Sequence, residues 1–259
     1  MFIINQKQRL DIILLNLQKN NSLTLQEILD LTGSSRDTAR RDIIKLVNNN
    51  MAVRNYGGLS LPNSYNKLSV FLDRMDEEKT EKQKIAESAS KLVQSGDFLY
   101  LDVSTTVSFL PQYLKQIKSL FTITNSIDIA DKLLKQTACK VRLLGGNLDR
   151  EKRCVTGTKA LSDLTDYHFN KAFLSAVGIT QQGIFYAYDE DIEFKKQIRK
   201  RTDQLILLLD HKKINATHNF HVFNLKDIDV LITTASLPKK LEESLNINHV
   251  KIIKAKGYK

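Results

Sequence analysis

The first fifty residues place their apolar side chains at a helical spacing. In residues 6–20 the apolar positions recur about every 3.6 residues, at Leu10, Ile13, Leu14 and Leu17. Residues 22–33 begin with a short extended piece, and the spacing of Thr24 and Glu27 fits a capping box. A second helix should start there and end at Gly33, because glycine is the common residue just past a helix end.

A third amphipathic helix follows. Ser35 is a favourable N-cap, and Asp37 in the first turn complements the helix dipole. At about 100° per residue, one side of this helix is apolar and carries Ala39, Ile43, Leu46 and Val47. The other side carries Thr38, Arg41 and Lys45, with Arg40 on the flank. Two of these cations, Arg40 and Arg41, are adjacent and lie near the start of the helix.

Residues 51–62 alternate around a glycine turn, which predicts a two-stranded ribbon. Two helices, a tight turn, a basic second helix and a ribbon are typical of a winged helix-turn-helix, whose second helix enters the DNA major groove. Arginine can bind guanine O6 and N7, and hydroxyls bind phosphates or base edges. The alternative is a solvated face on a small helical subdomain. The predicted contacts to double-stranded operator DNA are Ser35, Arg36, Asp37, Thr38, Arg40, Arg41, Lys45, Arg54 and Tyr56.

The rest of the chain has the pattern of an α/β domain. Residues 81–93 read as an amphipathic helix, and apolar runs then alternate with helical pieces at 97–102, 120–125, 140–146, 171–178, 205–210, 229–234 and 250–254. Continuous apolar strands separated by helices predict a mostly parallel sheet covered on both faces. We therefore predict a DNA-binding domain at 1–62, a linker or connecting helix at 63–80 and an α/β domain at 81–259.

Small and polar residues follow three successive predicted strands. Ligands of such sheets bind beyond the carboxyl ends of the strands, and hydroxyls at helix starts suit anions. The two glycines after the third strand would let backbone approach a ligand closely. These candidate ligand-binding residues are Asp102, Ser104, Thr105 and Thr106, then Thr124, Asn125 and Ser126, then Gly145 and Gly146.

The chain resembles the DeoR family of bacterial transcriptional repressors. In the DNA-binding domain, called the head below, the family signature is matched by Ser35, Thr38, Arg40, Arg41, Asp42, Arg54, Gly57 and Gly58. Ala39 stands where the family has a larger aliphatic residue, and Tyr56 stands where it has a histidine. In the second domain the resemblance implies a sensor fold similar to ribose-5-phosphate isomerase and adds Glu190, Lys195, Asp210 and Lys213 to the effector site. Ser104 stands where the family has glycine, Lys212 where it has serine, and Thr234 where it has aspartate.

Composition fits this interpretation. The net charge of +10 favours a polyanionic partner, although residues 1–66 hold only 8 Lys and Arg against 5 Asp and Glu. Cys139 and Cys154 cannot form a disulfide framework, and the start of the chain is interrupted by charges where a signal peptide would be apolar. We expect a cytoplasmic repressor of a sugar operon that is released by a phosphorylated sugar. It should need no cofactor, bind no membrane and assemble as a dimer or tetramer, since one head reads only a few base pairs.

Four alternatives remain. A sugar-phosphate isomerase with a DNA-binding head needs a positioned carboxylate, and the stretch after the fourth strand has none before Asp189. A zinc site could use His218 and His221, but that segment reads as a solvated loop. The basic stretch 193–201 could bind an anionic surface, although an exposed helix with Lys195 turned inward is the simpler interpretation. A sequence-blind architectural DNA binder would lack the second domain.

Overall fold

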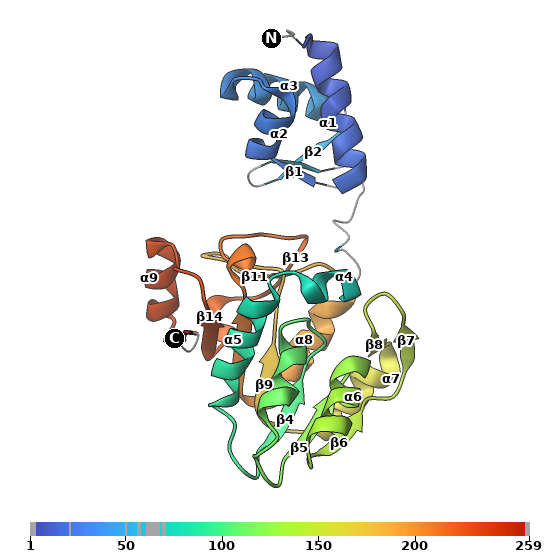
Figure 1. Ribbon diagram of the computed structural model, residues 1–259, viewed down its shortest axis with the longest axis vertical. Helices are drawn as coiled ribbons and strands as arrows, with labels where there is room; N and C mark the ends of the chain where they lie inside the picture. The colour runs from blue at the N-terminus through green and yellow to red at the C-terminus, as the bar shows by residue number, and fades with distance from the viewer. Residues whose placement is uncertain are drawn as a thin grey trace. The chain divides into compact units, whose positions relative to one another are not determined.

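The computed structural model describes residues 4–20, 22–49, 51–55, 58–60, 68 and 71–256, and its contacts divide the chain into two units, residues 1–67 and 68–259. The first unit holds helices α1 (Gln6–Asn20), α2 (Leu25–Thr32) and α3 (Arg36–Asn48) with strands β1 (Ser22–Thr24), β2 (Val53–Asn55) and β3 (Gly58–Ser60) (Figure 1). The predicted ribbon gains a third strand, because β1 pairs with β3 and Leu23 lies opposite Leu59 in the core.

The helix ends are set by the residues that the pattern indicated. The Thr24 hydroxyl accepts the Glu27 N–H, and the Glu27 carboxylate accepts the Thr24 N–H at 2.6 Å, which completes the capping box. Gly33 ends α2 with a φ of 59°, a conformation that costs glycine little. Ser35 caps α3 by accepting the Thr38 N–H. The tight turn between α2 and α3 is therefore determined locally.

The second unit is built on a seven-stranded sheet in the order β15-β14-β12-β9-β4-β5-β6, and every neighbouring pair is parallel. Its strands are β4 (Phe98–Leu101), β5 (Phe121–Thr124), β6 (Lys140–Leu143), β9 (Phe169–Leu174), β12 (Thr202–Leu209), β14 (Val230–Thr233) and β15 (Lys251–Lys254). These strands coincide with the seven predicted runs, so the prediction of a parallel α/β sheet is confirmed.

Each face of the sheet carries its own core, because side chains alternate along the strands. Leu99 and Leu101 of β4 face a core shared with α5 (Lys79–Ser90), α6 (Ile127–Gln136) and the 3-10 helix η1 (Val107–Tyr113), whereas Tyr100 faces the opposite core. That second core is covered by α7 (Thr158–Asp163), α8 (Glu190–Lys200) and α9 (Lys239–Ile247) and by a small antiparallel sheet of β10 (Gly178–Thr180), β11 (Gly183–Tyr186) and β13 (Phe220–Phe223). The small sheet was not predicted.

Three further features complete the unit. Strands β7 (Asn147–Asp149) and β8 (Cys154–Thr156) form a hairpin. Residues 71–80, inside the range predicted to be a linker, form α4 (Phe71–Asp76) and the start of α5. Short 3-10 turns complete the chain at η2 (Leu164–Asp166), η3 (His211–Lys213) and η4 (Leu225–Asp227). Among the described residues, no helix has both the length and the apolar character needed to cross a membrane.

Candidate DNA-reading surface and effector cavity

The side of α3 that faces away from the head core is highly charged. Its exposed residues from the predicted set are Arg36, Asp37, Arg40, Arg41 and Lys45. Arg41 Nε donates to the Asp37 carbonyl at 3.3 Å, Arg40 Nη1 lies 4.0 Å from Asp37 Oδ1, and Lys45 Nζ donates to Gln6 Oε1 at 2.9 Å. Exposed ion pairs contribute only about 0–1 kcal/mol. These cations can therefore turn toward a polyanion at little cost.

The remaining predicted DNA contacts divide into three groups. The Ser35 and Thr38 hydroxyls lie 3.0 Å apart and bond to each other at the start of α3. Arg54 is exposed on β2. Tyr56, together with Gly57, lies outside the described residues.

Asp42, the acidic residue of the signature, has a structural position. Its carboxylate is fully buried and accepts from Arg9 Nε at 2.7 Å and from Gln6 Nε2 at 3.1 Å. Both donors lie on α1. Because a buried charge needs a partner, this ion pair holds α1 against α3 and keeps the cationic side of α3 outward.

In the second unit, the candidate site lies where the sheet reverses its strand order. From β4 the chain continues to β5 and β6 on one side, whereas β9, β12, β14 and β15 follow on the other. Ligand crevices of open α/β sheets form at the carboxyl ends of strands at such a point. A cavity of about 420 Å³ is found there, within the range of small-molecule sites.

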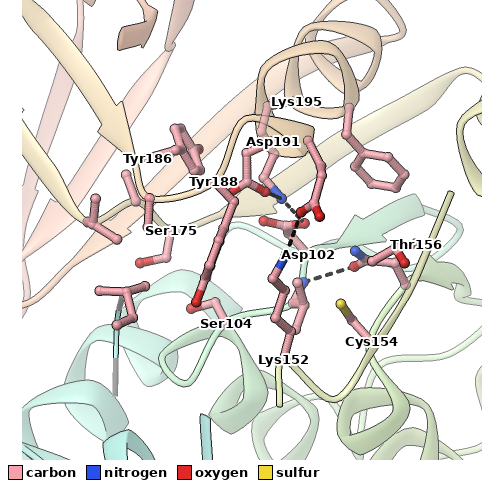
Figure 2. Close-up of a pocket in the computed structure, with 18 of the residues that line it drawn as sticks. Asp102, Ser104, Lys152, Cys154, Thr156, Ser175, Tyr186, Tyr188, Asp191 and Lys195 are labelled. Atoms are coloured by element: carbon pink, nitrogen blue, oxygen red, sulfur yellow. Dashed lines mark hydrogen bonds and ion pairs between the residues drawn. The ribbon is translucent and has the colours of Figure 1, made fainter. Parts of the chain in front are cut away.

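Figure 2 shows the residues that converge on this cavity. Of the predicted effector residues, the cavity is lined by Asp102, Ser104, Asn125, Glu190, Lys195 and Lys213. It is not lined by Thr105, Thr106, Thr124, Ser126, Gly145, Gly146 or Asp210. The first group comes from four places far apart in the sequence that the sheet topology brings together.

Lys195 and Asp102 form a buried ion pair at the centre of the cavity wall. Lys195 is 2% exposed, as the inward orientation predicted, and its Nζ lies 2.8 Å from Asp102 Oδ1 and 3.2 Å from Asp191 Oδ1. Burial raises the pKa of Asp102 to about 6, despite the ammonium beside it. The pKa of Lys195 is raised, because the two carboxylates outweigh the opposing effect of its burial. Lys195 is thus a charged residue already neutralised by the protein.

The predicted residues outside the cavity support its walls. Thr124 Oγ1 donates to the Leu101 carbonyl at 2.6 Å, and Ser126 caps α6 by accepting the Ile129 N–H. A Cβ on Gly146 would lie 2.5 Å from the Thr156 carbonyl, so this glycine allows close approach to β8 and not to a ligand. Thr106 Oγ1 is buried and has no hydrogen-bond partner among the described residues.

Ser104, which replaces the family glycine, is engaged by its own loop. Its Oγ accepts the Thr106 N–H at 3.1 Å and the Val107 N–H at 3.3 Å. The element that follows is the 3-10 helix η1, with Pro111 inside it. Ser104 lines the cavity, and its hydroxyl therefore satisfies two amides that lie behind it.

The sequence reasoning missed much of the lining. The additional polar and aromatic residues include Arg74, Lys152, Cys154, Thr156, Ser175, Tyr186, Tyr188 and Asp191. Lys152 pairs with Glu190 and lies 3.8 Å from the centre of the Tyr188 ring. The Tyr186 hydroxyl is buried without a hydrogen-bond partner in the described part of the chain. Lys152 and Arg74 follow no predicted strand end, so the strand-end rule alone could not have found them.

One side of the cavity gathers cations. Lys213 Nζ lies 3.0 Å from Asp210 Oδ2 and 3.3 Å from Ser175 Oγ. Behind it, Lys82 is buried and donates to the Arg74 carbonyl. Burial lowers the pKa of Lys82 to about 8, and the neighbouring charge of Lys213 adds to this effect. Lys82 and Lys213 thus lie close enough for their charges to repel each other.

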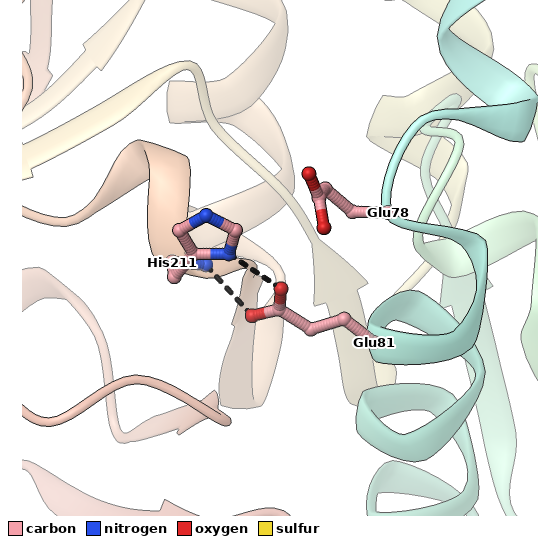
Figure 3. Close-up of side chains that lie close together, drawn as sticks. All are labelled: Glu78, Glu81 and His211. Carbon is pink, nitrogen blue, oxygen red and sulfur yellow. Dashed lines mark hydrogen bonds and ion pairs between the residues drawn. The ribbon is translucent and has the colours of Figure 1, made fainter.

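The histidines are not arranged as the predicted zinc alternative, with His218 and His221 as ligands, would require. His221 lies on β13 and packs 5.5 Å from the Phe185 ring, so it is not in the loop that was expected. His211 instead approaches Glu81 and Glu78 (Figure 3). Glu81 is already bonded to His211 Nδ1 at 2.6 Å and to the Thr234 hydroxyl, and Glu78 pairs with Lys212 at 3.0 Å. A metal at this place would have to displace these partners.

Comparison with known proteins agrees with both units. Residues 9–65 match the profile of the DeoR-like helix-turn-helix domain, and residues 77–235 match that of the DeoR C terminal sensor domain. The chain is 36% identical over 248 residues to the HTH-type transcriptional repressor GlcR of Bacillus subtilis (strain 168), covering 96% of each. It is 23% identical to the glycerol-3-phosphate regulon repressor of Escherichia coli (strain K12), covering 96% of this chain and 99% of that one.

Among solved structures, ribose 5-phosphate isomerase A from Methanocaldococcus jannaschii aligns with a TM-score of 0.39 at 17% identity, covering 53% of this chain and 55% of that one. The two profile matches and the full-length similarity to GlcR establish the assignment. This chain belongs to the DeoR family of helix-turn-helix transcriptional regulators.

Proposed function

We propose that this protein is a transcriptional repressor of a sugar-catabolism or sugar-transport operon, released from operator DNA by a phosphorylated sugar. The observation that carries the proposal is the cavity at the carboxyl end of β4, in a chain whose other unit exposes a cationic helix. The glycerol-3-phosphate regulon repressor, a relative, is named for a phosphorylated polyol.

The distribution of charge in the cavity suits such a ligand. Lys213 and Arg74 line one side with Lys82 behind them, which favours the phosphate there. The Asn125 amide and the carboxylates of Asp102 and Glu190 line the rest, and such groups bind sugar hydroxyls. We therefore place the phosphate beside Lys213 and Arg74 and not beside Lys195, whose charge is already paired with Asp102 and Asp191.

The connection to the head supplies a route for the signal. Leu68, Phe71 and Arg74 line the cavity and belong to the segment that follows the first unit. Phe71 is buried, and its N–H donates to the Glu151 carbonyl at 3.3 Å. A ligand that contacts α4 can prefer one position of this segment. Coupling requires only such differential affinity, typically about 1–3 kcal/mol.

The proposal includes a dimer or tetramer, because useful operator specificity needs at least two heads on repeated half-sites. It also includes residues 1–62 as the DNA-binding domain, 63–80 as the connection and 81–259 as the sensor, in the cytoplasm of the cell.

A thermal-shift screen of phosphorylated sugars, followed by operator titration with each hit, tests the proposal. A ligand at a hundred times its dissociation constant should stabilise the protein by about 2.7 kcal/mol. Arg74→Gln should bind the hit more weakly, whereas the exposed neighbour Asp73→Asn serves as the matched control. A panel in which no phosphorylated sugar shifts the transition or weakens operator binding would refute the proposal.

A sugar-phosphate isomerase is the second candidate, and Asp102 favours it. A pKa of about 6 lies in the range of a general base, and α8 adds Glu190 and Asp191 to the cavity although the stretch after β9 lacks carboxylates. Regulation is the better interpretation because Asp102 already accepts from the Lys195 ammonium. If the purified protein isomerises phosphorylated aldoses, the isomerase is the correct function.

A further inference from the structure

Ile44 is an apolar residue on the charged side of α3. Its side chain is 48% exposed, whereas the buried residues of the helix are Ala39, Asp42, Ile43 and Leu46. At about 100° per residue, the direction opposite to that buried set passes through Asp37, Arg41, Ile44 and Asn48. Ile44 therefore lies at the centre of the outward surface, between the arginines and the end of the helix.

A single exposed apolar side chain is ordinary on a protein surface, so the exposure of Ile44 carries no argument by itself. What distinguishes Ile44 is the set of charges around it. Here Arg40 and Arg41 precede Ile44 by one turn and Lys45 follows it, and all three are exposed. A partner that covers this surface must be anionic toward the cations and apolar at one point between them. Duplex DNA meets both conditions, because thymine presents a C5-methyl group in the major groove between the phosphate backbones.

We propose that Ile44 is a specificity-determining residue that packs on the C5-methyl group of an operator thymine. The inference rests on the proposed function of the head as an operator reader. Side chains three or four residues apart on a helix lie about 5–6 Å from each other at Cβ, and stacked base pairs lie about 3.4 Å apart. The thymine should therefore lie within about two base pairs of the base that Arg41 contacts.

Replacing one thymidine of the operator by deoxyuridine removes only the C5-methyl group of the base, and so tests this contact directly. The full-length protein is first used to select operator duplexes from a random library. Each thymine of the selected sequence is then replaced in turn by deoxyuridine, and affinity is measured at fixed salt. At one thymine in each half-site, the substitution should weaken the wild-type protein about fourfold, the effect of burying one methyl group.

The variants assign the effect to the side chain. Ile44→Ala should bind the thymine and deoxyuridine duplexes equally, and Ile44→Val should retain part of the difference. Leu15→Ala, which truncates a 67% exposed residue of α1, should behave as wild type. Because Ile44 is half-exposed, its truncation should leave the thermal transition of the head nearly unchanged, which confirms that the variant folds.

The inference is overturned if no thymine is sensitive to loss of its methyl group, or if Ile44→Ala is as sensitive as wild type. A change of sedimentation in Ile44→Ala with unchanged uracil sensitivity would place Ile44 at a protein contact, which also overturns it. Failure of the proposed function looks different. In that case the selection enriches no sequence, and Arg41→Ala has no effect on binding to any duplex.

Discussion

The two units use charge in opposite ways. On α3 the arginines are exposed and make only surface contacts, so their charge is available to a partner. In the sensor cavity the central ammonium of Lys195 is buried between Asp102 and Asp191. The comparison shows that a charged residue near a site is not by itself a ligand-binding residue. Burial and prior pairing decide whether its charge serves a partner or the fold.

The largest expected effect comes from breaking the buried pair. Lys195→Met should destabilise the protein by about 3–5 kcal/mol, because removing one partner of a buried ion pair leaves the buried Asp102 without its cation. Urea unfolding of the full chain measures the change. Lys196→Met, at the exposed neighbouring position, should stay within about 0.5 kcal/mol of wild type. Equal losses for the two variants would show that burial does not distinguish these lysines.

Stability should also depend on pH through Asp102. Its pKa is raised from 3.8 in the unfolded chain to about 6 in the fold, so folding favours the protonated form. The resulting stabilisation is fully present below pH 3.8 and is lost as pH rises through about 6. The free energy of unfolding of wild type minus that of Asp102→Asn should therefore fall between pH 4 and 7. Parallel pH profiles for the two proteins would contradict the assignment.

On the head, removal of an exposed charge should affect binding and leave folding unchanged. Arg41→Ala should cost about 1–3 kcal/mol on the selected operator and relax discrimination at one base pair, because Arg41 lies at the centre of the outward side of α3. Arg40→Ala and Arg54→Ala should weaken all duplexes alike and reduce the salt slope by about one. Titrations at several salt concentrations measure both effects. An unchanged ratio of operator to random binding in Arg41→Ala would assign Arg41 to phosphate.

The head could be predicted from sequence because its determinants are local. The capping box at Thr24, the turn at Gly33 and the N-cap at Ser35 each act within four residues, and helical periodicity separates the two sides of α3. Ile44 was not among the predicted contacts, because only polar residues of α3 were taken as candidates and apolar ones as core. Its 48% exposure agrees with its place on the outward side of the helix.

The sensor could be predicted only in part. Apolar runs identified the seven strands, since a strand buried on both faces must be continuous in hydrophobic residues. The cavity walls depend on contacts between distant segments: the β7–β8 hairpin brings Lys152, and α4 brings Arg74. The strands of the small sheet are only three or four residues long, too short to show a period. Gly146 was assigned to a ligand because sequence cannot say which backbone approaches a glycine.

The smallest expected effect lies at Ser104, a residue that lines the cavity but whose hydroxyl is bonded within the protein. Ser104→Gly removes a hydroxyl that accepts the Thr106 and Val107 N–H groups, and glycine in place of such a cap costs only a few tenths of a kcal/mol. The two amides belong to buried residues behind Ser104, and without the hydroxyl an anionic ligand that enters this loop can accept from them. We expect the variant to unfold almost as wild type does in urea and to respond to equal or lower concentrations of the effector in operator titrations. Ser104→Ala is the matched comparison, since it also removes the hydroxyl but keeps a Cβ that narrows the loop. A weaker effector response in Ser104→Gly than in wild type would mean that the serine hydroxyl itself contacts the ligand.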